Sequence, residues 1–323
     1  MALAKVAFGV FLPFYAFRGQ IQVPSLFGNL KSVVLECERL GYDSVWLDDH
    51  LMFGRTPILE SWTTLSALAS ATSKIRLGTM VTANGFRNPA LLAKMSATVD
   101  VVSNGRIEFG VGLGVQKDEH LAYGYPFQKP SVRAERLKES VEIVKQMWTQ
   151  EKSTYAGKHY NIVDAVCEPK PLQKPHPRIV IAGSGEKHTL NVTALYADRL
   201  DFGYLPTLEE YRRKLQVLKA HCESVGRDFN EIEKSCWPAG QLLIAQDIAS
   251  AKAKKRKFKS PCMSRVDFEK FNFVGTPDDC AALLQPYLDL GVTYFMLFFA
   301  DLPQTGSLRL FADTFREMKQ RAN

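Results

Sequence analysis

Residues 74–120 constrain the fold more than any other stretch of this chain. Apolar runs at 75–80 and 107–111 flank a helical pattern at 89–102. A crossover of this length joins parallel strands, because a tight turn can join only antiparallel ones. Both apolar runs end in glycine and small polar residues, at the end of the strands where parallel α/β folds bind ligands. The stretch therefore predicts a parallel β-α-β unit with a candidate ligand site.

The same alternation of strand and helix patterns extends over the whole chain. Eight runs of strand length are each followed by a helical pattern. The strands are expected at 6–12, 42–47, 75–80, 107–111, 178–182, 201–204, 235–244 and 293–299. Several are apolar throughout, as expected for strands covered on both faces. Eight such units in 323 residues favour an α/β fold, a (β/α)8 TIM barrel, with an open doubly wound sheet as the alternative.

The domain organisation is expected to be simple. No internal repeat or low-complexity linker is present, so residues 1–323 are expected to form one domain, with irregular insertions at about 151–177 and 245–275. No apolar run approaches the roughly 18 residues of a membrane span. The first apolar run is followed by Pro13 and not by a small-residue cleavage site, so it predicts a buried strand. We therefore expect a cytoplasmic protein with no membrane partner.

The net charge of +7 comes mainly from the basic residues of segment 252–259. Nucleic acid and a polyanionic small ligand are both compatible with such a cluster, and so is a solvated surface loop. The rest of the chain is nearly balanced in charge, which argues against a basic face. We therefore expect a small-molecule substrate and no nucleic acid.

The cysteines and known motifs exclude several classes of protein. No two of the six cysteines form a C-x-x-C pair, and no histidine-rich segment lies near them with the spacing of a zinc site. We expect reduced structural thiols and no bound metal. The chain also lacks the G-x-S-x-G, phosphate-binding-loop and H-E-x-x-H motifs, which argues against hydrolases, nucleotidases and zinc proteases.

Asp48, Asp49 and His50 directly follow the second predicted strand, on the rim that all strand ends share in a barrel. A carboxylate beside an imidazole raises its basicity and fixes its tautomer, which suits a general base or a hydrogen-bond donor to a cofactor. A metal site is disfavoured because adjacent side chains on an extended segment point in opposite directions. A solvated loop or a helix-capping cluster is the alternative.

Gly183, Ser184, Gly185 and Glu186 follow the fifth predicted strand and precede a helix expected at 186–197. Small residues let backbone amides approach a phosphate at a helix N-terminus. An ordinary turn with Ser184 as N-cap is an equal alternative. The glycines after the fourth strand, at 110–114, indicate close approach of a flat ligand or simple packing.

These pieces together resemble the bacterial luciferase-like superfamily of (β/α)8 flavin and deazaflavin oxidoreductases. The resemblance rests on segments that follow the family's order over nearly the whole chain. They are 41–51, 75–114, 122–127, 179–198 and 275–303. The pair Asp49-His50 resembles the branch that uses coenzyme F420, a 5-deazaflavin.

The resemblance implies roles for particular residues. It implies that His50 and Asp49 are catalytic and that both contact the cofactor. It also implies a cis peptide between Met80 and Val81 that supports the cofactor ring from behind. The remaining cofactor-binding residues expected from the resemblance are Thr82 and Gly112 at strand ends, and Gly183, Ser184, Gly185 and Glu186 in the loop for the cofactor phosphate.

Val115 departs from the family pattern. Many relatives have Trp at this position, and sugar-oxidising members have Glu. With Val115 the chain has neither the aromatic wall of the first group nor the acid of the second. This argues against oxidation of a sugar phosphate. The resemblance implies an F420-dependent oxidoreductase that transfers hydride, acting as a homodimer. The alternatives are an FMN-dependent monooxygenase and a cofactor-free barrel that serves as a binding or structural subunit.

Overall fold

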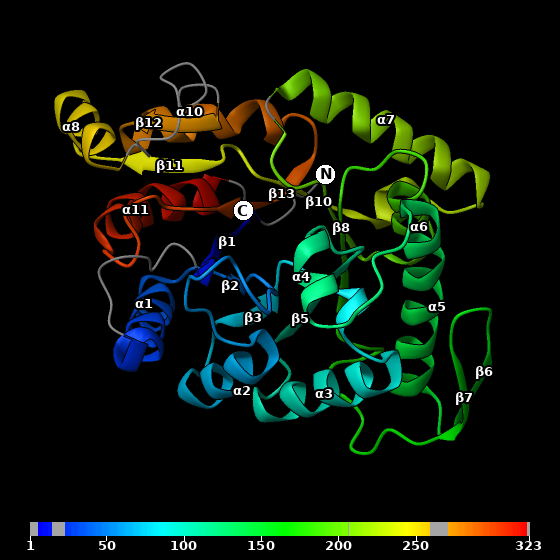
Figure 1. The fold of residues 1–323 in the computed structure, drawn as a ribbon. Helices are drawn as coiled ribbons and strands as arrows, with labels where there is room; N and C mark the ends of the chain where they lie inside the picture. The colour runs from blue at the N-terminus through cyan, green and yellow to red at the C-terminus, as the bar shows by residue number, and fades with distance from the viewer. Residues whose placement is uncertain (1–5, 15–22, 206, 259–270, 322–323) are drawn as a thin grey trace.

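The computed structural model describes residues 6–14, 23–205, 207–258 and 271–321. Eight parallel strands form a closed barrel in chain order, which confirms the predicted fold class (Figure 1). The strands are β1 (Ala7–Phe11), β2 (Ser44–Leu47), β3 (Arg76–Thr79), β5 (Ile107–Gly112), β8 (Arg178–Ala182), β9 (Arg199–Asp201), β10 (Glu233–Cys236) and β13 (Val292–Leu297). The pairing of β13 with β1 and of β3 with β5 closes the barrel.

Helices surround the barrel, and local sequence determines where they begin (Figure 1). Asn88 caps α3 by accepting the N–H of Ala90, and Pro89 takes the first helical position. Thr276 and Asp279 form a capping box at α10. The large helices are α1 (Leu26–Leu40), α2 (Ser61–Ala71), α3 (Pro89–Val102), α5 (Pro130–Thr149), α6 (Thr189–Tyr196), α7 (Leu208–Ser224), α10 (Pro277–Leu288) and α11 (Gly306–Arg321).

Smaller elements extend the connections between strands and helices. An antiparallel hairpin lies within the predicted insertion at 151–177, and a separate parallel strand pair with one helix lies in the second insertion. These elements are β6 (Ser153–Ala156), β7 (Asn161–Ala165), β11 (Gln241–Ile244), α8 (Ile248–Phe258) and β12 (Asn272–Gly275). Near the carboxyl ends of the barrel strands are β4 (Thr82–Ala83) and α4 (Lys117–Ala122). Short 3₁₀ helices cover Val23–Ser25, Asn84–Phe86 and Phe229–Glu231.

Two predicted strands differ from the structure. The seventh, expected at 235–244, is two strands, of which only β10 belongs to the barrel. Between them Pro238 has no N–H for a ladder, and Gly240 approaches the Phe271 backbone so closely that a Cβ would lie 2.6 Å from its oxygen. The second insertion therefore begins at β11, ahead of the predicted boundary. The sixth strand was expected at 201–204 but begins at Arg199. The prediction missed this start because Arg199, a buried charged residue, interrupts the apolar pattern by which strands are recognised.

A solvated loop was one of the interpretations of the basic segment 252–259, but residues up to 258 form helix α8. Alanine and lysine, which make up most of α8, favour helices. Lys254 is tied into the fold, because its Nζ donates to the carbonyl of Ile244 at 2.8 Å and to Asp301 at 2.9 Å. Lys259 lies outside the described residues.

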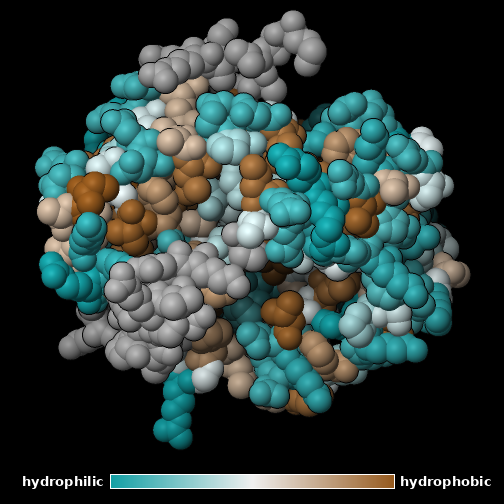
Figure 2. Space-filling view, turned by 90° about the horizontal axis from the view of Figure 1, so that it is seen from above, coloured by the Kyte–Doolittle hydropathy of each residue, from teal (hydrophilic) through white to brown (hydrophobic). Residues whose placement is uncertain are grey.

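The core fills the barrel and the space beneath its helices. Figure 2 shows a face that is mainly hydrophilic, with hydrophobic residues in small groups. Within the described ranges, no helix combines the length and apolar character needed to cross a bilayer. The five described cysteines are buried and unpaired, and Cys262 lies outside the described residues.

Candidate active site

A cavity of about 360 Å³ opens at the carboxyl ends of the strands. It brings together eight of the predicted site residues, which come from four different strand ends: Asp49, His50, Met80, Val81, Gly112, Gly183, Ser184 and Gly185. Two predicted residues are not in its lining. Thr82 is buried and does not line the cavity. Its hydroxyl is hydrogen-bonded to the hydroxyl of Thr79 at 2.7 Å and accepts the indole N–H of Trp62 at 3.2 Å. Glu186 lies just beyond the rim.

His50 is held by a carboxylate that the sequence prediction did not assign to the site. Its Nδ1 lies 2.9 Å from Oε2 of Glu119, which comes from the short helix α4. The other oxygen of Glu119 accepts the N–H groups of Leu51 and Met52. Glu119 is almost fully buried, whereas His50 retains 19% of its side-chain exposure toward the cavity. The imidazole is therefore anchored on one side and accessible on the other.

Asp49 is fixed by partners other than His50. Its two oxygens accept both terminal nitrogens of Arg87 at 2.7 and 2.8 Å, the hydroxyl of Ser61 at 2.6 Å and the N–H of Ala83 at 2.9 Å. Burial lowers the pKa of Arg87, but the bonds to Asp49 and Glu60 raise it overall. Asp49 therefore joins three segments of the rim.

Asp48 points away from Asp49, as predicted for adjacent residues on an extended segment, and accepts the N–H of Phe14 at 2.9 Å. Burial raises the pKa of Asp48 to about 6, against the smaller opposing effects of this hydrogen bond and of His50. Because the folded state holds this proton more tightly than the unfolded state, Asp48 lowers stability progressively as the pH rises from about 4 to about 6.

The variant Asp48→Asn is expected to remove this penalty while keeping an oxygen for the Phe14 N–H. Its unfolding free energy relative to the wild type should rise by on the order of 2 kcal/mol between pH 4 and pH 7. Urea unfolding at both pH values measures this difference. Asp247→Asn is the matched control, because the pKa of the exposed Asp247 is lowered by its hydrogen bonds to Ser250. A constant difference for Asp48→Asn across this pH range would contradict the account.

Met80 and Val81 form a bulge at the end of β3, and the peptide bond between them is cis, as the resemblance implies. The glycines of β5 make room for this bulge. A Cβ on Gly110 would lie 1.9 Å from the carbonyl oxygen of Thr79, and one on Gly112 would lie 2.8 Å from Cγ2 of Val81. Of the two interpretations of these glycines, the structure therefore supports packing against the bulge.

The loop after β8 has a different helix start from the one predicted. Helix α6 begins at Thr189 with His188 as N-cap, so Ser184 does not cap it. Lys214 donates to the carbonyl of Ser184 at 2.9 Å and to Glu186 at 2.7 Å. These contacts hold the loop against α7 and place the Nζ of Lys214 beside it. Gly183 and Gly185 line the cavity without side chains, so the backbone of the loop is exposed to it.

The cavity suits a planar heteroaromatic cofactor. Its walls are mostly apolar, with the Met80-Val81 bulge, Phe86 and Leu113 among them. Polar groups border it at His50 on one side and at the loop 183–185 on the other. Apolar walls with few placed polar groups are typical of cofactor sites. Among the described residues no cluster of three potential metal ligands is present.

Three charged residues that line or support the cavity were not predicted as site residues: Arg87, Glu119 and Arg133. Arg133 donates to the carbonyl of Gly114, and its guanidinium lies 4.2 Å from the ring centre of Phe127. Glu119 lies on a helix of six residues, which is too short to show a helical pattern in the sequence. The only available signal was its position on the shared rim after the fourth strand.

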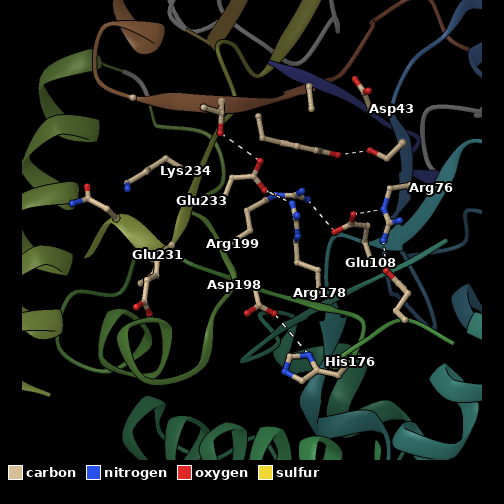
Figure 3. A pocket seen from close by; sticks show the side chains of 18 of the residues that line it. Asp43, Arg76, Glu108, His176, Arg178, Asp198, Arg199, Glu231, Glu233 and Lys234 are labelled. Atoms are coloured by element: carbon tan, nitrogen blue, oxygen red, sulfur yellow. Dashed lines mark hydrogen bonds and ion pairs between the residues drawn. The ribbon is translucent and has the colours of Figure 1, made fainter. Parts of the chain in front are cut away.

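A larger groove, of about 1220 Å³, lies at the amino ends of the strands (Figure 3). Its charged groups neutralise one another. Glu108 pairs with Arg76 and Arg199, and Glu233 pairs with Arg178 and Arg199. Burial would raise the pKa of Glu108, but the arginines lower it overall. Because the amino end of such barrels serves stability, we place the candidate active site in the smaller cavity.

The fold and this cavity define a (β/α)8 barrel of the enzyme type, with an apolar-walled cavity at the carboxyl end of its strands. The chain belongs to the luciferase-like monooxygenase family, whose model matches residues 6–271, and is thereby an oxidoreductase by class. This confirms the resemblance found in the sequence.

Named relatives agree with this assignment. A protein of Kineococcus radiotolerans, named F420-dependent glucose-6-phosphate dehydrogenase, is 30% identical over 304 residues, covering 83% of this chain and 86% of the relative. A protein of Amycolatopsis mediterranei with the same name is 27% identical over 300 residues, covering 83% and 87%. The structure of an F420-dependent secondary alcohol dehydrogenase with an F420–acetone adduct superposes with a TM-score of 0.80 at 19% identity, covering 96% of this chain and 98% of that one.

Proposed function

We propose that this protein is an F420-dependent oxidoreductase that transfers hydride between the 5-deazaflavin and a small organic substrate. Two relatives that align with most of the chain are named as F420-dependent dehydrogenases. The observation that carries the proposal is the accessible imidazole of His50, held by Glu119 in an apolar-walled cavity beside the Met80-Val81 bulge.

Coenzyme F420 would supply a hydride acceptor or donor at the central carbon of its flat ring. The chain would bind the ring between the bulge and the opposite wall, and the loop 183–186 would hold the phosphate. In the direction of alcohol oxidation, Nε2 of His50 would accept the O–H proton of the substrate, and the C–H hydride would pass to the bound cofactor. A carbonyl product remains, so atoms and charge balance.

The substrate is proposed to be something other than a sugar phosphate, although two relatives are named for glucose 6-phosphate. Val115 is 77% exposed at the cavity and provides no acid. The carboxylates that line the cavity are occupied by Arg87 and His50, and Arg133 is stacked on Phe127. These contacts favour a substrate with little charge.

An FMN-dependent monooxygenase is the second candidate, because the matching family model is named for monooxygenases. Fluorescence titration of the purified protein with F420 and, separately, with FMN distinguishes the two. We expect binding of F420 at least about tenfold tighter than that of FMN, a difference of about 1.4 kcal/mol. Tight binding of FMN without affinity for F420 would overturn the proposal, and failure to bind either would favour the cofactor-free barrel.

A further inference from the structure

Glu119 is placed so that both of its oxygens act on the segment that carries His50. Oε2 lies 2.9 Å from Nδ1 of His50, and Oε1 accepts the N–H groups of Leu51 and, at 3.0 Å, of Met52. The side chain of Glu119 is only 3% exposed. A buried carboxylate with three donors around it acts as an acceptor, so the imidazole nitrogen donates to it.

This donation determines which nitrogen of His50 carries the proton. With Nδ1 protonated, Nε2 of the neutral ring has a free lone pair. None of the groups in the described part of the chain is hydrogen-bonded to Nε2, and His50 lines the cavity. The ring therefore presents a proton acceptor to a ligand in the cavity.

Helix α4 is itself held firmly, which gives Glu119 a fixed position. The next residue, His120, is almost fully buried and packs 4.3 Å from the ring centre of Phe86 and 5.1 Å from that of Phe127. The hydroxyl of Tyr123 donates to the carbonyl of Leu51 at 2.9 Å. The segment after β2 is thus contacted by Glu119 within α4 and by Tyr123, the residue that ends the helix.

We propose that Glu119 is the positioning residue of the active site: it fixes His50 in the tautomer that is protonated at Nδ1 and keeps Nε2 available as the proton acceptor. This inference rests on the proposed function for its chemical consequence. When Nε2 takes the hydroxyl proton of a substrate, the ring becomes an imidazolium. The carboxylate of Glu119 then balances that charge at 2.9 Å without moving.

The tautomer can be measured without any cofactor. In a protein labelled with ¹⁵N-histidine, held at a pH where His50 is neutral, the wild type should show protonated Nδ1 and unprotonated Nε2. Glu119→Gln keeps the size of the side chain and an oxygen for the backbone N–H groups, and should shift His50 to a mixture of tautomers. Glu135→Gln is the matched control. Glu135 lies 3.0 Å from Nε2 of His159, which is in the turn between β6 and β7, so this variant should alter the tautomer of His159 and not that of His50.

Turnover provides the second readout. Glu119→Gln should lower kcat about 10- to 100-fold and change KM less than about twofold, as expected for the loss of an orienting partner. A wild-type His50 protonated at Nε2 would overturn the inference, and so would an unchanged tautomer in Glu119→Gln. If the protein turns over no substrate with F420, the proposed function fails, but the tautomer measurement still decides the role of Glu119.

Discussion

Replacement of His50 by alanine is expected to lower kcat by about 10²- to 10⁴-fold, the range for loss of a general acid–base group. Among the described residues that line the cavity, the other titratable side chains are less available to a ligand: Asp49 is bound to Arg87, Glu119 and His120 are buried, and Arg133 is stacked on Phe127. Stopped-flow measurement of hydride transfer, which follows the absorbance of F420, gives this rate.

The fold should tolerate this substitution. His50 lies at the cavity surface, and Glu119 keeps the N–H groups of Leu51 and Met52 as partners. The unfolding free energy should therefore change by about 1 kcal/mol or less. His159→Ala removes another histidine that contacts a glutamate, but far from the cavity lining, and should leave kcat unchanged. If His50→Ala retains activity within a factor of two, His50 is not the acid–base residue.

Gly110→Ala is expected to have the largest effect on stability. The new methyl group would lie 1.9 Å from the carbonyl oxygen of Thr79 and 3.3 Å from Cγ1 of Val81. The Thr79 hydroxyl also donates to the carbonyl of Gly110 at 2.9 Å, so the two strands cannot separate without breaking this bond. Because the clash is with backbone, we expect a loss of about 4 kcal/mol or failure to fold.

Gly28→Ala is the control for this prediction. Gly28 lies in helix α1, and a Cβ there would have no neighbouring atom within 4 Å. Alanine in a helix is favoured over glycine, so this variant should gain about 0.5–1 kcal/mol. Denaturant unfolding measures both variants. A Gly110→Ala protein as stable as the wild type would show that β3 and β5 are not as closely packed as described.

The barrel could be predicted because several of its strands, such as β8 and β13, are apolar runs buried on both faces. Strand β9 was displaced in the prediction because Arg199 is buried through ion pairs with Glu108 and Glu233, which sequence patterns do not reveal. Strands β10 and β11 were merged although Pro238 and Gly240 lie between them, because the local pattern does not show that two short strands belong to different sheets.

The candidate site was predicted through the rule that strand ends share one rim, and this rule brought Asp49, His50 and Gly183 to one cavity. It could not predict partners. The carboxylate on His50 is Glu119, 69 residues away, and not its neighbour Asp49. Such pairs depend on how helix α4 packs, which sequence alone does not determine. The homodimer, the cytoplasmic location and the absence of a nucleic-acid partner stay predictions.

The central claim is that F420 binds in the cavity at the carboxyl end of the barrel. Ala182 lines this cavity, whereas Asn230 lines the groove at the opposite end. The most direct measurement is fluorescence titration of F420 into the wild type, Ala182→Phe and Asn230→Phe, after thermal unfolding has shown that all three fold. We predict that Ala182→Phe weakens binding more than about tenfold, or 1.4 kcal/mol, and that Asn230→Phe leaves it unchanged. Unchanged binding in Ala182→Phe, or loss of binding in Asn230→Phe alone, would contradict the account.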